Sequence, residues 1–229
     1  MTHILCLETA TEICSAALSA DGECIACHEE AEGNSHAEKI MELTDRCLKN
    51  AGLAPENLDA VCISGGPGSY TGLRIGTSTA KGICYARAIP LIAVPSLEGI
   101  ARGAITAMPD VDICCPMIDA RRMEVYCALY DPHGNPLTEA ESKIIDTTSF
   151  AEERKKYRIV FCGNGAAKCS EALQGENSLF SGTLSSARHL VQSAFRRWQL
   201  KQFENVAYYE PFYLKAFIAG KPHVKGLEE

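Results

Sequence analysis

The sequence contains two twelve-residue stretches that align without a gap, Leu7-Glu8-Thr9-Ala10-Thr11-Glu12-Ile13-Cys14-Ser15-Ala16-Ala17-Leu18 and Ile118-Asp119-Ala120-Arg121-Arg122-Met123-Glu124-Val125-Tyr126-Cys127-Ala128-Leu129. Each begins at the end of an apolar strand that closes on a carboxylate, passes through a tight turn and enters a second strand. Few residues are identical, but the pattern is the same. Because an internal repeat constrains the whole fold, this one predicts two lobes built on the same plan.

The elements expected around these two stretches extend the repeat. In the first half we expect strands at 4–8, 15–19, 23–29, 59–64 and 90–94, and helices at 35–51, 71–87 and 97–107. In the second half we expect strands at 112–119, 123–130, 137–145 and 158–162, with helices at 147–155 and 186–202. A β-β-β-α-β-α unit used twice builds the actin-like ATPase fold (ASKHA, ribonuclease H-like). The sequence therefore predicts this α/β fold, with lobes at 1–107 and 108–229 and the second lobe abbreviated.

The composition is that of an ordinary globular protein, with 46% hydrophobic and 22% charged residues. The net charge of −7 disfavours direct binding to nucleic acid, which depends on neutralising phosphates. No window approaches the roughly 20 apolar residues of a membrane helix. The first eight residues have no basic segment of the kind that opens a signal peptide. We therefore expect a cytoplasmic protein that does not bind membranes.

Twelve cysteines are many for this length, and without an export signal we expect free thiols that pack as small hydrophobic side chains. The one Cys-x-x-Cys motif joins Cys24 and Cys27 inside a predicted strand. An offset of three residues in a regular strand places two side chains on opposite faces. We therefore expect no metal site there.

The glycine-rich segment Ser64-Gly65-Gly66-Pro67-Gly68-Ser69-Tyr70-Thr71-Gly72-Leu73-Arg74-Ile75-Gly76 connects a predicted strand to a predicted helix. Backbone N–H groups at such a junction can hold an anion. The segment lacks the Lys and Ser/Thr of a P-loop and the third glycine of a dinucleotide-binding loop. Alternatively, the small residues Gly72, Gly76 and Ala80 recur on one helix face and allow another backbone to approach closely. Both explanations are compatible with the sequence.

The segment from Gly66 to Gly76 closely resembles the signature segment of the TsaB (YeaZ) family, with Tyr70 where phenylalanine is common. Other segments resemble the family in the same order along the chain. They are Ile4–Thr11, Ser96–Gly99, Asp119–Tyr126, Gly163–Ala166 and Pro211–Lys215.

The resemblance implies a non-catalytic scaffold subunit of the machinery that forms N6-threonylcarbamoyladenosine next to the anticodon of tRNA. The implied partners are TsaD, which forms the heterodimer, and TsaE. A homodimer is implied when the chain is alone, and tRNA is reached only through the complex. No cofactor of its own is implied, although ATP or ADP could bind in the complex.

TsaD-like subunits hold a metal with two histidines four residues apart, and here Ser96 and Ile100 stand at those positions. None of the six histidines is four residues from another. Since neither side chain can replace an imidazole, we expect neither a metal site nor a catalytic residue. The alternative functions are an independent nucleotide hydrolase or peptidase, and direct RNA binding.

Helix phase and the resemblance together predict a partner interface on the first two helices, at Ile40, Leu43, Cys47, Tyr70, Arg74 and Thr77. Alternatively, the first helix, whose apolar and small residues cover a wide arc, is buried deep in its own core. A weak nucleotide site is predicted at Glu8 and Asp119, which end equivalent strands, and at Gly163 and Gly165. Alternatively, the two carboxylates only stabilise turns, and the two glycines form an ordinary strand–helix turn.

Overall fold

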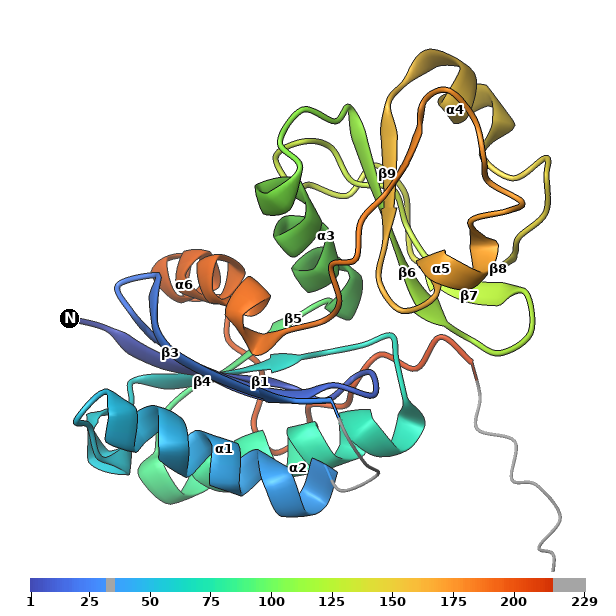
Figure 1. Ribbon diagram of the computed structural model, residues 1–229. Coiled ribbons are helices and arrows are strands. Elements are labelled where there is room, and N and C mark those ends of the chain that lie inside the picture. Colours follow the sequence, from blue (N-terminus) through green and yellow to red (C-terminus); the bar gives the residue numbers. More distant parts are fainter. Residues whose placement is uncertain (32–35, 216–229) are drawn as a thin grey trace, which may run out of the picture.

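The computed structural model describes residues 1–31 and 36–215, and Figure 1 shows the two lobes that they form. The first lobe contains a five-stranded sheet in the order β3-β2-β1-β4-β5. Strands β1 and β2 pair antiparallel, whereas β1, β4 and β5 run parallel. The strands are β1 (His3–Glu8), β2 (Cys14–Ala20), β3 (Glu23–Glu30), β4 (Ala60–Ser64) and β5 (Leu91–Val94).

The second sheet has the order β10-β9-β6-β7-β8 and repeats the first strand for strand. Its central strand β6 pairs antiparallel with β7 and parallel with β9, as β1 does with β2 and β4. The strands are β6 (Ile113–Asp119), β7 (Glu124–Cys127), β8 (Glu141–Ile144), β9 (Ile159–Cys162) and β10 (Ser178–Phe180). Glu8 and Asp119 end β1 and β6, so the internal repeat and the predicted actin-like fold are confirmed.

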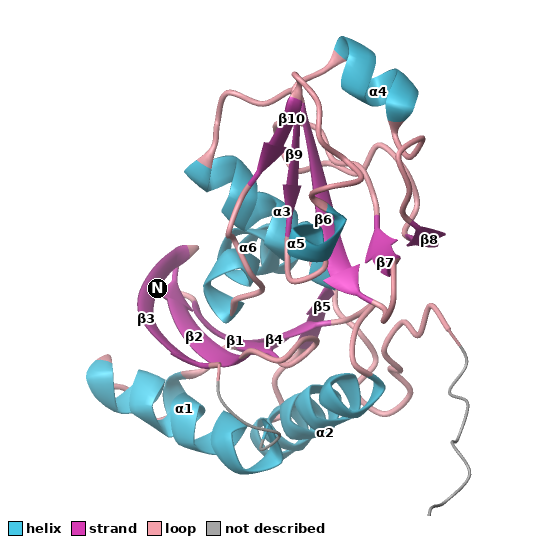
Figure 2. Ribbon diagram, turned by 45° about the vertical axis from the view of Figure 1, so that its right-hand side comes forward, coloured by secondary structure: helices cyan, strands magenta, loops and turns pink. Residues whose placement is uncertain are grey.

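The helices cover both faces of each sheet (Figure 2). Helices α1 (His36–Asn50) and α2 (Tyr70–Arg87) cover one face of the first sheet. The short 3-10 helix η2 (Ala187–Leu190) and α6 (Val191–Gln199) cover its other face. In the second lobe α4 (Ala151–Lys156) and α5 (Ala166–Cys169) follow β8 and β9 in the chain, as α1 and α2 follow β3 and β4, and α5 packs on the sheet. They are much shorter, and the second lobe is abbreviated as predicted.

The packing crosses the predicted lobe boundary at 107/108 in both directions. Helix α3 (Ser96–Ala107) precedes that boundary, but it packs on β6 and β9 of the second sheet. Helix α6 follows it, but packs on β1 and β5 of the first sheet. The chain therefore exchanges one helix between the lobes, and α3 and α6 lie between the two sheets (Figure 1).

Several element boundaries differ from those predicted. The helix expected at 186–202 divides into η2 and α6, and β7 is shorter than the strand expected at 123–130. Strand β10 and the 3-10 helix η1 (Pro55–Asn57) were not predicted. Ser35, the first residue of the helix expected at 35–51, lies outside the described residues.

The Cys24-x-x-Cys27 motif does not have the expected geometry. Ser19 pairs with Cys24, but Leu18 pairs with Ala26, so Ile25 is an extra residue in β3. Such a β-bulge changes the alternation of side chains. Because Cys24 and Cys27 are opposite residues 19 and 17 of β2, their thiols lie on the same face, and the prediction of opposite faces was wrong.

Within residues 1–31 and 36–215, no group of three His, Cys, Asp or Glu side chains is placed to hold a metal ion. None of the helices in those two ranges is long and apolar enough to cross a membrane.

Candidate functional site

A cavity of about 830 Å³ lies between the two lobes, where β1 and β6 end. One wall is the turn at 10–12 after β1, together with the start of the glycine-rich helix at 68–72. The other wall is formed by residues 118–121 after β6 and by Asn164. The C-terminal residues 213–215 also line it. This inter-lobe cleft is where the internal repeat brings the two sets of strand ends together.

The glycine-rich segment is used to hold the turn that follows β1. A Cβ atom on Gly72 would lie 2.0 Å from the Thr9 carbonyl oxygen, and one on Gly68 would lie 2.4 Å from that of Ala10. The backbone N–H of Ser69 donates to Ala10 O at 2.7 Å, and Thr9 Oγ1 donates to Gly72 O at 2.8 Å. The glycines therefore allow two backbones to come into contact. This agrees with the second of the two explanations from sequence, the close approach of another backbone.

Glu8 does not line the cleft. Its side chain is 1% exposed, and its Oε1 accepts a hydrogen bond from the backbone N–H of Ala10 at 2.6 Å. Burial raises the pKa of this carboxyl to about 7, although the hydrogen bond from the backbone of Ala10 favours the ionised form. Glu8 therefore stabilises the turn after β1, and the prediction that it faces a cleft shared with Asp119 is corrected.

The raised pKa of Glu8 makes folding stability depend on pH. The unfolded carboxyl titrates near 4.5 and the folded one near 7, so the folded state binds more protons between these values. Glu8 therefore contributes stability below pH 4.5 that is lost as pH rises through 7. Relative to Glu8→Gln, the wild type should lose roughly 3 kcal/mol of unfolding free energy between pH 4.5 and 8. Urea unfolding of both proteins at several pH values measures this difference, and parallel stability curves would contradict it.

Asp119 lines the cleft, but its carboxylate is already bound. Its Oδ1 accepts from Lys168 Nζ and from the backbone N–H of Arg121, both at 2.6 Å. Partial burial acts to raise the pKa of Asp119, but the hydrogen bonds from Lys168 and Arg121 and the positive charge of Lys168 together outweigh it, so the pKa lies below its usual range. As at Glu8, the carboxylate stabilises the turn that follows its strand.

The second glycine turn packs against β6. A Cβ atom on Gly163, whose φ is +87°, would lie 2.4 Å from Met117 O, and the N–H of Gly165 donates to that same oxygen at 2.9 Å. Asn164, between the two glycines, is the residue of this turn that lines the cleft. Gly163 and Gly165 thus shape the turn, and they face β6 and not the cleft.

A direct contact bridges the two lobes across the cleft. Asn164 Nδ2, in the second lobe, donates to Glu12 Oε2, in the first, at 2.5 Å. The predicted nucleotide residues are therefore not brought together around an open space. Glu8 and Asp119 each bind groups of their own lobe, and Glu12, in the turn after β1, binds Asn164, in the turn after β9, across the cleft.

The C-terminal segment 202–215 also connects the two walls of the cleft. The backbone N–H of Phe212 donates to Gly65 O at 2.8 Å, and the ring of Tyr213 lies 5.0 Å from that of Tyr70. Lys215 then forms an ion pair with Glu124 of the second lobe. The segment thus runs from the first lobe to the second along the cleft.

Most of the predicted interface residues lie in the core. Ile40, Leu43 and Cys47 are fully buried between α1 and the first sheet. Thr77 is also buried, on the inner side of α2. These four side chains are excluded from contact with a partner in this structure, which corrects the assignment made from helix phase. The wide apolar arc of α1 reflects deep packing against its own sheet.

The other two predicted interface residues are accessible, at the start of α2. Tyr70 is partly exposed, and the exposed Arg74 guanidinium lies 5.1 Å from the centre of its ring. Further exposed positions follow Arg74 at helical spacing along the same side of α2. We define the outer stripe of α2 as Thr71, Arg74, Ser78, Gly82 and Tyr85.

Ser96 and Ile100, which occupy the two histidine positions of TsaD-like subunits, have packing roles. Ser96 Oγ accepts from the backbone N–H of Gly66 at 3.0 Å and from Ser64 Oγ at 2.7 Å. Ile100 is 1% exposed in the core formed by α3 and the second sheet. These residues do not fit a metal ion, because neither offers a nitrogen or sulfur donor.

Comparison with known proteins supports the family resemblance that the sequence suggested. Residues 28–220, most of the chain, match the family model described as TsaD: tRNA N6-adenosine threonylcarbamoyltransferase. The tRNA threonylcarbamoyladenosine biosynthesis protein TsaB of Haemophilus influenzae is 36% identical over 123 residues, which are 54% of this chain and 51% of the relative. The chain thus spans about half the length of this curated relative.

Solved structures extend the likeness to nearly the whole chain. YeaZ from Pseudomonas aeruginosa superposes with a TM-score of 0.81 at 26% identity, covering 93% of this chain and all of that one. An activator of 2-hydroxyisocaproyl-CoA dehydratase from Clostridium difficile, solved with bound ADPNP, has a TM-score of 0.53 at 11% identity. It covers 89% of this chain and 99% of its own, and shares the fold alone. The chain therefore belongs to the family that the TsaD model describes and, within it, to the TsaB (YeaZ) family of tRNA threonylcarbamoyladenosine biosynthesis proteins.

Proposed function

We propose that this chain is a non-catalytic scaffold subunit that forms a heterodimer with TsaD, in a cytoplasmic complex with TsaE that makes N6-threonylcarbamoyladenosine in tRNA. The tRNA is contacted through the complex, consistent with the acidic charge of this chain. When TsaD is absent, the chain forms a homodimer. The observation that carries the proposal is the outer stripe of α2.

The outer stripe has the composition of a helix-packing surface. Small side chains at Ser78 and Gly82 lie between the larger Arg74 and Tyr85, and Tyr85 is 86% exposed. A Cβ atom on Gly82 would meet nothing within 4 Å, so another helix can approach closely there. Arginine and tyrosine are enriched at protein interfaces. Helix α2 contains no Asp or Glu in a chain of net charge −7, which favours a partner surface that is neutral or acidic.

The inter-lobe cleft supports the non-catalytic part of the proposal. Glu8 is buried against the turn after β1, and Asp119 is bound by Lys168 and Arg121. Glu12 and Asn164 bridge the cleft. A metal-dependent hydrolase needs carboxylates that are free to take up the ion. We therefore propose that ATP or ADP binds in the assembled complex, and that this subunit has no cofactor of its own.

The proposal is tested by mixing the chain with the TsaD of the same organism and measuring the mass of the complex by size-exclusion chromatography with light scattering. The variant is Gly82→Arg, because Gly82 is exposed on the stripe and an added side chain has open space in the monomer. Its matched control is Gly182→Arg, since Gly182 is also exposed, has nothing within 4 Å of its Cβ position and lies in the second lobe. We expect wild type and Gly182→Arg to form the heterodimer, and Gly82→Arg to lose at least roughly 100-fold in affinity.

Absence of a heterodimer with wild type at micromolar concentrations, with ATP present, would refute the scaffold function. A heterodimer that Gly82→Arg leaves intact would show that the partner binds elsewhere. Magnesium-dependent ATP turnover by the pure chain would instead support the alternative of an independent hydrolase.

A further inference from the structure

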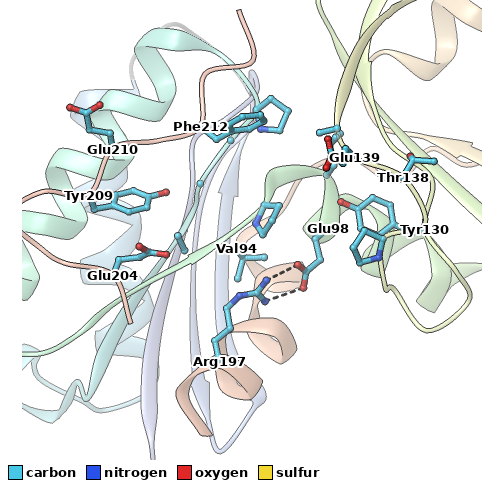
Figure 3. Close-up of a pocket in the computed structure, with 18 of the residues that line it drawn as sticks. Val94, Glu98, Tyr130, Thr138, Glu139, Arg197, Glu204, Tyr209, Glu210 and Phe212 are labelled. Carbon is cyan, nitrogen blue, oxygen red and sulfur yellow. Dashed lines mark hydrogen bonds and ion pairs between the residues drawn. The ribbon is translucent and has the colours of Figure 1, made fainter. Parts of the chain in front are cut away.

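A second cavity, of about 920 Å³, lies on the opposite side of the glycine-rich segment from the inter-lobe cleft and has no part in the proposed function. Figure 3 shows it between the end of β5, the β7–β8 connection and the C-terminal segment. Its walls are largely apolar, with Val94, Leu97, Leu137 and Phe212 among the lining residues. Its volume is within the range of about 300–1,000 Å³ typical of small-molecule sites.

The charge around this cavity is negative. The carboxylates of Glu139 and Glu204 point into it from opposite sides, whereas that of Glu210 points away (Figure 3). Among residues 1–31 and 36–215, Arg197 is the one cationic residue that lines the cavity, and its guanidinium is already held by both oxygens of Glu98, at 3.1 and 2.8 Å. Ser193 and Arg102 also bind Glu98. No other cation of the described part of the chain lines the cavity to offset Glu139 and Glu204, and this negative charge disfavours anionic ligands such as nucleotides.

Tyr130 supplies an independent indication of a ligand. Its side chain is 4% exposed and lines the cavity, and Figure 3 shows its hydroxyl directed inward near Glu139. No described residue forms a hydrogen bond with this hydroxyl, which faces the cavity and is therefore available to a molecule bound there. Burial and the nearby Glu98 raise the pKa of Tyr130, so its hydroxyl stays protonated and can donate.

Three aromatic rings complete the site. Tyr130 lies on one side, and Tyr209 and Phe212 lie on the other (Figure 3). Aromatic faces attract organic cations, and carboxylates nearby strengthen that attraction. We propose that this cavity binds a small organic ammonium ion, held by the three rings and by Glu139 and Glu204, with an oxygen that accepts the Tyr130 hydroxyl proton in a hydrogen bond.

The test uses the full chain and choline as the probe, because choline combines a quaternary ammonium group with a hydroxyl oxygen. The matched neutral probe is 3,3-dimethylbutan-1-ol, in which carbon replaces nitrogen. Titrations followed by NMR should show that choline binds at least about tenfold more tightly than the neutral alcohol. Tyr130→Phe and Glu139→Gln should each weaken choline binding by at least about threefold. Glu56→Gln, an exposed carboxylate of η1 outside the cavity, should leave it unchanged.

Tyr130→Phe removes a hydroxyl that no described group binds, so its thermal unfolding should match that of the wild type. Equal affinities for choline and the alcohol would show an apolar cavity without cation recognition and overturn the proposal. The proposal would also be overturned if neither probe bound to millimolar protein when the probe concentration was 50 times the protein concentration. Choline binding that both variants leave unchanged would place the ligand elsewhere and have the same consequence.

Discussion

Gly72→Ala is expected to lose roughly 3 kcal/mol or more of unfolding free energy, a large effect for the addition of one methyl group. The new Cβ would lie 2.0 Å from the carbonyl oxygen of Thr9, which is a backbone atom. Thr9 cannot move away easily, because its hydroxyl donates to Gly72 O and its neighbour Ala10 accepts from Ser69 N. Relief of the clash therefore requires α2 to separate from the end of β1. Urea unfolding at pH 6 measures the loss.

Gly82→Ala is the matched control on the same helix. Its Cβ would meet nothing within 4 Å, so the change should be neutral or should stabilise the protein by roughly 0.5–1 kcal/mol, as expected for a glycine inside a helix. The two variants should thus differ in sign although the chemical change is the same. If Gly72→Ala lost less than about 1 kcal/mol, the close approach of α2 to the turn after β1 would not be what the glycine-rich segment provides.

The repeat was predictable from sequence because it depends on patterns of residues that are close together in the chain. Strands that end in Glu8 and Asp119, each followed by a tight turn and a second strand, are visible in twelve residues. Alternation and turn residues are short-range signals, and the structure confirms the repeated plan that they predict. The spacing of Gly72 and Gly76 also suggested a close approach to this helix face, where Gly72 meets the backbone of Thr9 and Gly76 meets its side chain.

The assignments that failed depend on contacts between distant parts of the chain. The apolar arc of α1 fits both a core helix and an interface helix, and only the packed sheet shows that Ile40, Leu43 and Cys47 are buried. The bulge at Ile25, which places Cys24 and Cys27 on one face, depends on the register with β2. The path of the C-terminal segment along the cleft depends on single contacts such as that between Tyr213 and Tyr70.

Arg197→Met alone is expected to lose roughly 3–5 kcal/mol of unfolding free energy at pH 7, because it leaves a buried carboxylate with much less compensation. Glu98 lies on α3, which packs on the second sheet, and Arg197 lies on α6, which packs on the first. The pair therefore joins the two lobes through helices that the chain exchanges between them. Glu98 is 8% exposed, and with Arg197 gone Ser193 and the more distant Arg102, at 3.4 Å, remain to bind it.

The double variant Glu98→Gln/Arg197→Met separates two contributions to this loss of stability. One is the cost of a buried carboxylate without its partner, and the other is the lost packing of the Arg197 methylene groups. Removing both charges abolishes the cost of a buried unpaired carboxylate, so the double variant should recover most of the stability that Arg197→Met loses.

The pH dependence provides a second test. Burial opposes ionisation of Glu98, but Arg197 and Ser193 hold its pKa below the usual range. Without Arg197 that pKa should rise, so the deficit of Arg197→Met should shrink as pH falls through 5, where protonation removes the charge. A deficit that is the same at pH 5 and pH 8, and that the double variant retains, would show that Arg197 acts through the packing of its methylene groups and that the ion pair does not hold the lobes together.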